Sequence, residues 1–127
     1  MARWRRIAVV AATILITSVL AGPAAADSGG YTFAVIGDMP YGTAAIAAFP
    51  KAIAQINADP AVRLVTHLGD IKNGSSLCTD EYFRLIRSDF DQFQDPLVYT
   101  PGDNEWTDCH RLNNGGYNPL ERLAKVR

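Results

Sequence analysis

Three short apolar runs alternate with longer amphipathic segments along the chain. The runs are rich in Val, Ile, Leu, Tyr and Thr and cover residues 31–36, 64–68 and 97–100. Apolar runs of this length, bounded by Gly, Pro, Asn or Asp, are typical of buried strands. Because the segments between them have helical spacing, the pattern predicts βαβ units with parallel strands, and hence a β-α-β-α-β layer of the α/β class.

The first amphipathic segment repeats its apolar residues at intervals of three or four, at Ile46, Phe49, Ile53 and Ile56. Pro50 interrupts this segment, so the helix either begins near Pro50 or has an earlier turn that kinks there. Residues 57–60, Asn-Ala-Asp-Pro, end it.

Two further helices are predicted. Thr79 is a good N-cap, and Asp80 and Glu81 follow it in the first turn, where the helix dipole favours negative charge. The apolar stripe of this helix is Tyr82, Leu85, Ile86, Phe90 and Phe93. After a loop at 111–118, Pro119 can occupy the first turn of a last helix over 120–126.

Each predicted strand is followed by the same dipeptide, Gly37-Asp38, Gly69-Asp70 and Gly102-Asp103. The carboxyl ends of parallel strands lie on one edge of a sheet, so we expect the three aspartates to converge there although they are far apart in sequence. Clustered carboxylates repel one another unless a cation lies between them. The repeat therefore predicts a divalent metal site, with Asp70 as the natural bridging ligand between two ions.

The motifs at residues 37–41 (Gly-Asp-Met-Pro-Tyr), 69–74 (Gly-Asp-Ile-Lys-Asn-Gly) and 102–105 (Gly-Asp-Asn-Glu) resemble, in this order, the first three motifs of the calcineurin-like metallophosphoesterases. They are most similar to a secreted bacterial branch, over residues 33 to about 123. The resemblance implies the N-terminal portion of a four-layer α/β/β/α sandwich. It also implies two divalent metal ions, of Fe, Zn or Mn, and a small phosphomonoester or phosphodiester as substrate.

Carried over residue by residue, the resemblance implies that Asp38 binds the first metal ion and that Asp70 bridges both. Asp103 stands where the family usually has an asparagine ligand to the second ion. Asn104 replaces a catalytic histidine; it cannot act as a general acid, although it can donate a hydrogen bond to a phosphoryl oxygen. Glu105 matches the acidic partner of that histidine.

The chain departs from the family pattern in its histidines. Pro40 stands where the first motif often has a histidine ligand, and the later Gly-His-x-His motif is missing. We therefore expect residues 27–127 to be a partial domain that lacks its C-terminal half, exposes one apolar sheet face, and is weak or inactive alone. The alternative is a non-catalytic secreted remnant that binds a metal ion or phosphate. Pro40 also disfavours an aspartyl-phosphate hydrolase, which needs a second aspartate at that place.

Five residues near these motifs have two interpretations each. We interpret His67 as a packed, hydrogen-bonded histidine and His110 as a surface residue rather than a replacement acid. We expect Tyr41 and Trp106 to anchor the packing of rigid loops, although they could form an aromatic wall for a substrate. Asp108 fits a turn better than a metal site.

Residues 1–26 have a basic start, an apolar core over 7–20 and Ala24-Ala25-Ala26 before Asp27, which is the pattern of a secretory signal peptide cleaved after Ala26. The apolar run is short for a membrane span. We therefore predict a secreted protein with no stable membrane association after cleavage. An uncleaved N-terminal anchor is the alternative.

Without residues 1–26, nine basic residues face 13 acidic ones, a formal charge of −4. This balance and the lack of a basic patch argue against nucleic acid as a partner. Cys78 and Cys109 would reach an oxidising compartment, so a disulfide between them is favoured over free thiols. A zinc site is disfavoured because there is no CxxC pair.

Overall fold

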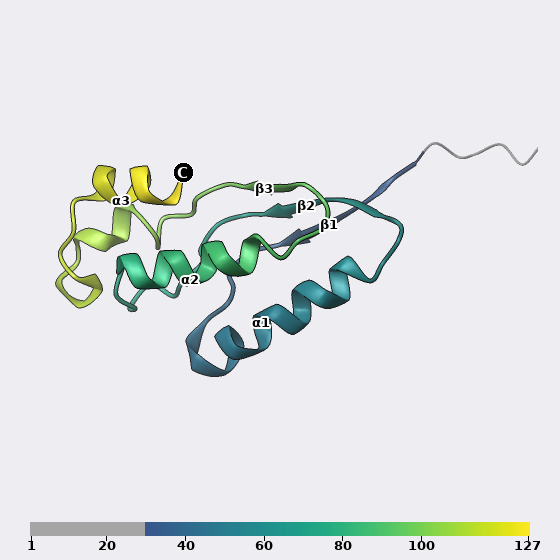
Figure 1. The fold of residues 1–127 in the computed structure, drawn as a ribbon. Coiled ribbons are helices and arrows are strands. Elements are labelled where there is room, and N and C mark those ends of the chain that lie inside the picture. Colours follow the sequence, from purple (N-terminus) through teal and green to yellow (C-terminus); the bar gives the residue numbers. More distant parts are fainter. Residues whose placement is uncertain (1–29) are drawn as a thin grey trace, which may run out of the picture.

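The structure is a computed structural model that describes residues 30–127. The elements in chain order are β1 (Thr32–Ile36), α1 (Gly42–Asn57), β2 (Val62–His67), α2 (Asp80–Phe90), β3 (Leu97–Tyr99), two 3₁₀ helices, η1 (Thr107–His110) and η2 (Leu112–Asn114), and α3 (Pro119–Val126). The three strands form one parallel sheet in the order β1-β2-β3, which confirms the predicted α/β fold. Their carboxyl ends point toward the part of the molecule that holds η1, η2 and α3 (Figure 1).

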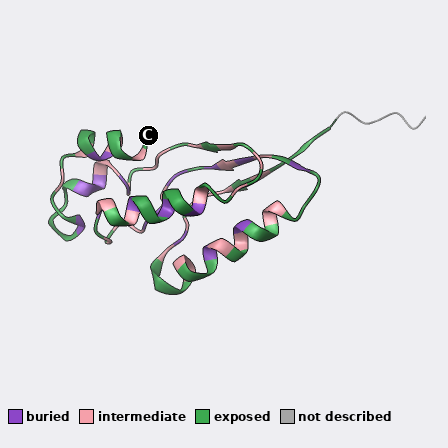
Figure 2. Cartoon of the chain, in the orientation of Figure 1, coloured by how far each residue is buried: buried purple, intermediate pink, exposed green. Residues whose placement is uncertain are grey.

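Helices α1 and α2 lie on the same side of the sheet (Figure 1). Side chains alternate along each strand, and on β2 the residues Val65 and His67 are fully buried on the helix side. Phe49 and Ile53 of α1 and Ile86 of α2 are also almost completely buried (Figure 2). Burial of these faces of the sheet and helices is the main stabilising contribution to this layer.

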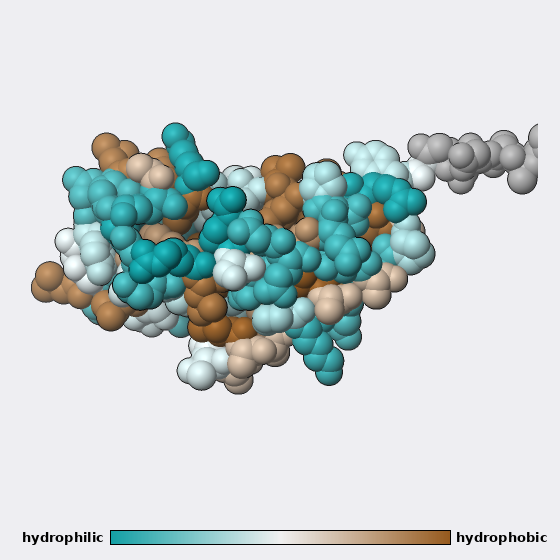
Figure 3. Space-filling view, in the orientation of Figure 1, coloured by the Kyte–Doolittle hydropathy of each residue, from teal (hydrophilic) through white to brown (hydrophobic). Residues whose placement is uncertain are grey.

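The opposite face of the sheet is apolar and exposed. Val35, Thr66 and Val98 lie in register across the three strands, and Val35 and Val98 are 52% and 50% exposed. Phe33, in the same alternation on β1, is exposed as well. These side chains are therefore about half exposed within the part of the chain that the structure describes. The face of the molecule drawn in Figure 3 is mostly hydrophilic with separate hydrophobic patches.

The helix boundaries settle one alternative and confirm the predicted cap of α2. Helix α1 begins at Gly42 and contains Pro50, so the helix does not start at the proline. Thr79 caps α2, because its hydroxyl accepts a hydrogen bond from the Tyr82 amide at 3.2 Å. Asn118 caps α3 in the same way, at 2.9 Å from the Leu120 amide.

The segment after β3 differs from the expectation. We predicted a loop over 111–118, but η2 covers residues 112–114, and η1 precedes it. Short 3₁₀ turns leave almost no periodic signal in a sequence, because they present only one or two side chains to the core. Gly115, with φ of 108°, ends η2 in the left-handed conformation that favours glycine.

Cys78 and Cys109 form the predicted disulfide. Their Cα atoms are 5.8 Å apart, and both residues are fully buried. The disulfide joins the segment before α2 to η1, in a core cluster with Ile71, Phe83 and Ile86. This excludes both free thiols and a zinc site at these two cysteines.

The predicted signal peptide, residues 1–26, lies outside the described residues. Among the helices of residues 30–127, none is long and apolar enough to cross a membrane.

Candidate metal centre

The Gly-Asp dipeptides lie at one edge of the sheet: the first follows β1 directly, the second follows β2 after one residue, and the third follows β3 after two. Asp38 and Asp70 have φ values of 55° and 52°. This left-handed region is uncommon for residues other than glycine, although aspartate tolerates it better than most, and such conformations cluster at functional sites. The backbone thus turns sharply at the first two aspartates.

The glycines allow the three loops to approach one another closely. The Asp38 amide donates a hydrogen bond to the Gly69 carbonyl at 3.0 Å, which joins the first loop to the second. A Cβ atom on Gly69 would overlap the backbone of Gly102, and one on Gly102 would overlap Asp70. The second and third loops therefore pack backbone against backbone, and this packing explains why glycine precedes both Asp70 and Asp103.

Glu105 lies fully buried beneath the loops. Its Oε1 accepts hydrogen bonds from the amides of Asp70 (3.1 Å) and Gly102 (2.8 Å) and from the Tyr99 hydroxyl (2.6 Å). Its Oε2 is buried without a partner among the described residues. Burial raises the pKa of Glu105, and the hydrogen bonds from the Tyr99 hydroxyl and the Gly102 amide oppose this rise only in part. Glu105 therefore holds the second and third loops together from below.

Asp70 is half-buried at the centre of the site. Its Oδ1 accepts a hydrogen bond from the Asn104 amide at 3.1 Å. Burial raises the pKa of Asp70; that hydrogen bond opposes the rise, and the nearby carboxylates of Asp103 and Asp38 add to it. A carboxylate with a raised pKa among like charges is the arrangement in which a bound cation is most stabilising.

Asp38 is exposed, and Tyr41 stands beside it. The Tyr41 hydroxyl donates to Asp38 Oδ1 at 3.3 Å. Burial, together with the negative charges of Asp38 and Asp70, raises the pKa of Tyr41 to about 12, while a hydrogen bond with the Asn104 side chain opposes the rise. The phenol, both carboxylates and the amide therefore share one small region. Pro40, at the position of the family's histidine ligand, is buried.

The two histidines lie as we interpreted them. His67 is fully buried, its Nδ1 accepts from the Gly69 amide at 3.2 Å, and its Nε2 faces the Met39 carbonyl at 3.1 Å. The proton therefore sits on Nε2, and burial lowers the pKa of His67, so the ring is neutral and structural. His110 is exposed, at the end of η1. Neither position is that of a metal ligand in this site.

Asp108 and Trp106 also lie near the third loop. Asp108 is buried and forms an ion pair with Arg111 at 2.6 Å, which agrees with a structural role in the turn. Trp106 is half-buried, and it precedes η1.

Sequence reasoning missed two buried polar residues under the site. Lys72 is 1% exposed and donates from Nζ to the carbonyls of Asn73 and Asn104, at 2.9 and 2.8 Å. Asn114 is fully buried and donates to the carbonyls of Gly74 and Asp108, both at 3.0 Å. The only sequence signal was the place of Lys72 two residues after a strand-end aspartate, which is weak because lysines are usually exposed.

The donor set matches a divalent cation in part. Carboxylate and amide oxygens suit hard ions such as Mg²⁺ or Mn²⁺. No described Lys, Arg or His forms an ion pair with Asp38, Asp70 or Asp103, so their negative charge is free for an ion. Within residues 30–127, however, no three His, Cys, Asp or Glu side chains are arranged so that they could hold a metal ion. The residues present thus fit part of a metal centre.

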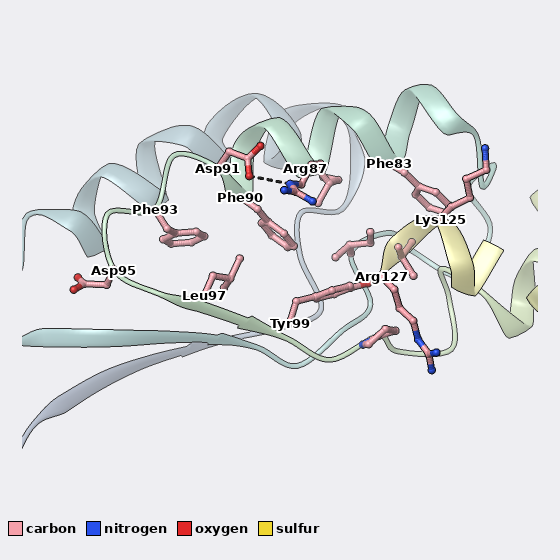
Figure 4. A pocket seen from close by; sticks show the side chains of 14 residues that line it. Phe83, Arg87, Phe90, Asp91, Phe93, Asp95, Leu97, Tyr99, Lys125 and Arg127 are labelled. Atoms are coloured by element: carbon pink, nitrogen blue, oxygen red, sulfur yellow. Dashed lines mark hydrogen bonds and ion pairs between the residues drawn. The ribbon is translucent and has the colours of Figure 1, made fainter. Parts of the chain in front are cut away.

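A separate pocket of about 650 Å³ lies between α2 and β3. Phe83, Phe90 and Tyr99 lie along it, and the Arg87–Asp91 ion pair lies on α2 above it (Figure 4). None of the three strand-end aspartates lines it. Aromatic, aliphatic and charged residues all line the pocket, and it is not the site described above.

Comparison with protein families adds one finding to this geometry. The family model described as calcineurin-like phosphoesterase matches residues 31–126, which include all three Gly-Asp loops. Searches of curated proteins and of solved structures returned no match. The matched residues make up about three quarters of the chain, and the three motifs lie at one edge of the sheet. The chain therefore belongs to the calcineurin-like phosphoesterase family.

Proposed function

We propose that this protein is a metal-dependent phosphoesterase whose site lies at the carboxyl edge of the sheet. The observation that carries the proposal is the contact of the second and third loops, which brings Asp70 near Asp38 and Asp103 above the buried Glu105. Carboxylates gathered without an ion-pair partner favour a bound divalent ion. Membership of the phosphoesterase family agrees with this chemistry.

In this proposal Asp38, Asp70 and Asp103 hold the divalent ions, of Fe, Zn or Mn. When bound, the ions supply an activated water and neutralise the charge of the phosphoryl group. The side-chain amide of Asn104 donates a hydrogen bond to a phosphoryl oxygen, and Glu105 holds the loops from below. A small phosphate ester is the proposed substrate, and residues beyond this set would complete the ligands.

The test compares wild-type protein with Asp70→Asn in Mn²⁺ titrations and in hydrolysis of a generic aryl phosphate. Asn keeps the oxygen that accepts from the Asn104 amide but removes the charge, so we expect intact folding and at least a tenfold loss of both Mn²⁺ affinity and activity. Asp89→Asn is the matched control, because Asp89 is a buried aspartate of α2 outside the site. Equal Mn²⁺ affinity in wild type and Asp70→Asn would refute the proposal.

The second candidate is a non-catalytic protein that binds a metal ion or phosphate. Two departures from the family pattern favour it: Asn104 stands in place of the usual acid, and Pro40 stands in place of a histidine ligand. Mn²⁺ or phosphate binding without turnover, lost in Asp70→Asn, would identify this function.

We also propose that the protein is secreted after cleavage behind Ala26. The basic start and apolar core of residues 1–26 support this, as does the buried disulfide, because disulfides persist in oxidising compartments. The mass of protein recovered from the medium tests it, with Asp27 expected as the first residue. An intact Met1 on the exported or cell-bound protein would contradict the cleavage.

A further inference from the structure

Lys72 is a buried cation that no step of the proposed function uses. It is 1% exposed, and no described carboxylate lies within ion-pair distance of its Nζ atom. Its hydrogen bonds go to two backbone carbonyls, one next to it in sequence and one 32 residues away, at Asn104. Lysines are almost never fully buried without a specific partner, so this burial requires an explanation.

The distant partner is the residue that also contacts Asp70. The Asn104 carbonyl accepts from Lys72 at 2.8 Å, while the Asn104 amide donates to Asp70 Oδ1 at 3.1 Å. Both disulfide sulfurs lie near the same carbonyl, at 3.6 and 3.7 Å, but they carry no hydrogen to donate. Lys72 is thus the one hydrogen-bond donor to this carbonyl among the described residues.

We propose that Lys72 is a positioning residue: through its hydrogen bond to the Asn104 carbonyl, it orients Asn104 so that the amide faces Asp70 and the side chain faces the site. The proposal rests on the proposed function only for its effect on metal binding. The hydrogen bond that fixes Asn104 is a property of the chain itself.

If Lys72 acts by positioning Asn104, its removal changes metal affinity in the opposite direction from the change expected if it acts only through its charge. Lys72 carries a positive charge close to Asp70, so by Coulomb's law alone its removal would tighten the binding of a cation. If Lys72 instead orients Asn104 and Asp70, its removal weakens binding, because residues that orient a metal site typically change affinity by about 10–100-fold. The direction of the change therefore decides between the two roles.

The experiment uses Lys72→Met, which cannot donate, and Lys72→Gln, which is also neutral but keeps a donor. Arg122→Met is the matched control, because Arg122 is also a buried cation that donates to a backbone carbonyl, that of Cys78 at 2.8 Å, and lies outside the site. Two quantities are measured well below each variant's melting temperature: amide hydrogen exchange at Asn104 in metal-free protein, and Mn²⁺ affinity by titration.

We expect Lys72→Met to speed exchange of the Asn104 amide by about tenfold or more and to weaken Mn²⁺ binding by about 10-fold. Lys72→Gln should lie between Lys72→Met and wild type, and Arg122→Met should match wild type in both quantities. Unchanged exchange at Asn104, or Mn²⁺ binding as tight as or tighter than in wild type, would overturn the proposal.

Two further outcomes are also decisive. If wild type binds no Mn²⁺, the proposed function fails, but exchange of the Asn104 amide still decides the role of Lys72. If Lys72→Met does not fold, Lys72→Gln takes its place: Gln is shorter than Lys, so the proposal requires faster Asn104 exchange than in wild type, and equal exchange refutes it.

Discussion

The loop that carries Asp70 and the loop that carries Asp38 sit side by side but are supported very differently. Around Asp70 the supports are buried: Glu105 below, Lys72 beside it, and the backbone of Gly102 in contact. Around Asp38 the aspartate is exposed, and its own hydrogen bonds are one to the Gly69 carbonyl and one from the exposed Tyr41 hydroxyl.

The supports of the two aspartates depend on one another in one direction: the third loop supports Asp70, and the loop of Asp70 supports Asp38. Asp38 is placed by the second loop, through the Gly69 carbonyl, and by His67, which contacts the Met39 carbonyl. Asp70 is placed by the third loop and by residues beyond it, through Glu105 and Asn104. A disturbance near the third loop should therefore reach both aspartates, whereas one near the first loop should stay local.

The largest expected loss of support for the Asp70 loop comes from removing the disulfide, with Cys78→Ala and Cys109→Ala together. The bond closes a loop with a sequence separation of 31 residues under the Asp70 side. Chain-entropy arguments give a loss of roughly 3–4 kcal/mol in unfolding free energy. Denaturant unfolding measures the loss, and hydrogen exchange of the Asn104 amide should become faster than in wild type. A loss below about 1 kcal/mol would contradict the central role of the disulfide.

Removal of the Glu105 carboxylate is the next largest change. Glu105→Ala leaves the amides of Asp70 and Gly102 and the Tyr99 hydroxyl without their acceptor, which should cost roughly 2–4 kcal/mol. Glu105→Gln keeps one acceptor oxygen and should cost less. Thermal and denaturant unfolding of the two variants measures both losses, and equal losses would argue against the hydrogen bonds as the cause.

The sequence predicted the elements but not these supports. The strands, the second and third helices and the Gly-Asp repeat were readable because periodicity and capping residues are local signals. The burial of Glu105, Lys72 and Asn114 could not be predicted from the sequence. Polar residues are normally exposed, and the burial of these three depends on partners 32 to 40 residues away. The roles of Asp38, Asp70, Asp103 and Asn104 remain predictions.

Asp70→Asn should stabilise the metal-free protein at neutral pH. Burial raises the pKa of Asp70 in the folded state above its ordinary value of 3.8, so the folded protein binds this proton more tightly than the unfolded chain. The resulting stability is present below pH 3.8 and is lost as the pH rises through the raised folded pKa. Asn does not titrate, so the variant should melt a few degrees higher at pH 7 and at the same temperature as wild type near pH 3.

The difference in melting temperature between Asp70→Asn and wild type needs no further control variant, because its dependence on pH identifies its cause. Glu105 also has a raised pKa, but it is present in both proteins, so its effect cancels when their melting temperatures are compared. Variant and wild type that melt together at pH 7 would show that Asp70 is not strained by burial and like charges.

The smallest expected effects come from removing one phenol hydroxyl near the Asp70 loop and one near the Asp38 loop. Comparing these two substitutions tests the difference between the loops most directly. Tyr99→Phe deletes the buried 2.6 Å hydrogen bond to Glu105 and should cost about 1–1.5 kcal/mol, as expected for a buried hydrogen bond. Tyr41→Phe deletes the exposed 3.3 Å hydrogen bond to Asp38 and should change stability by less than about 0.5 kcal/mol. Denaturant unfolding of the pair measures both. Equal losses would mean that the first loop is supported as firmly as the second, and that Asp38 is fixed independently of Asp70.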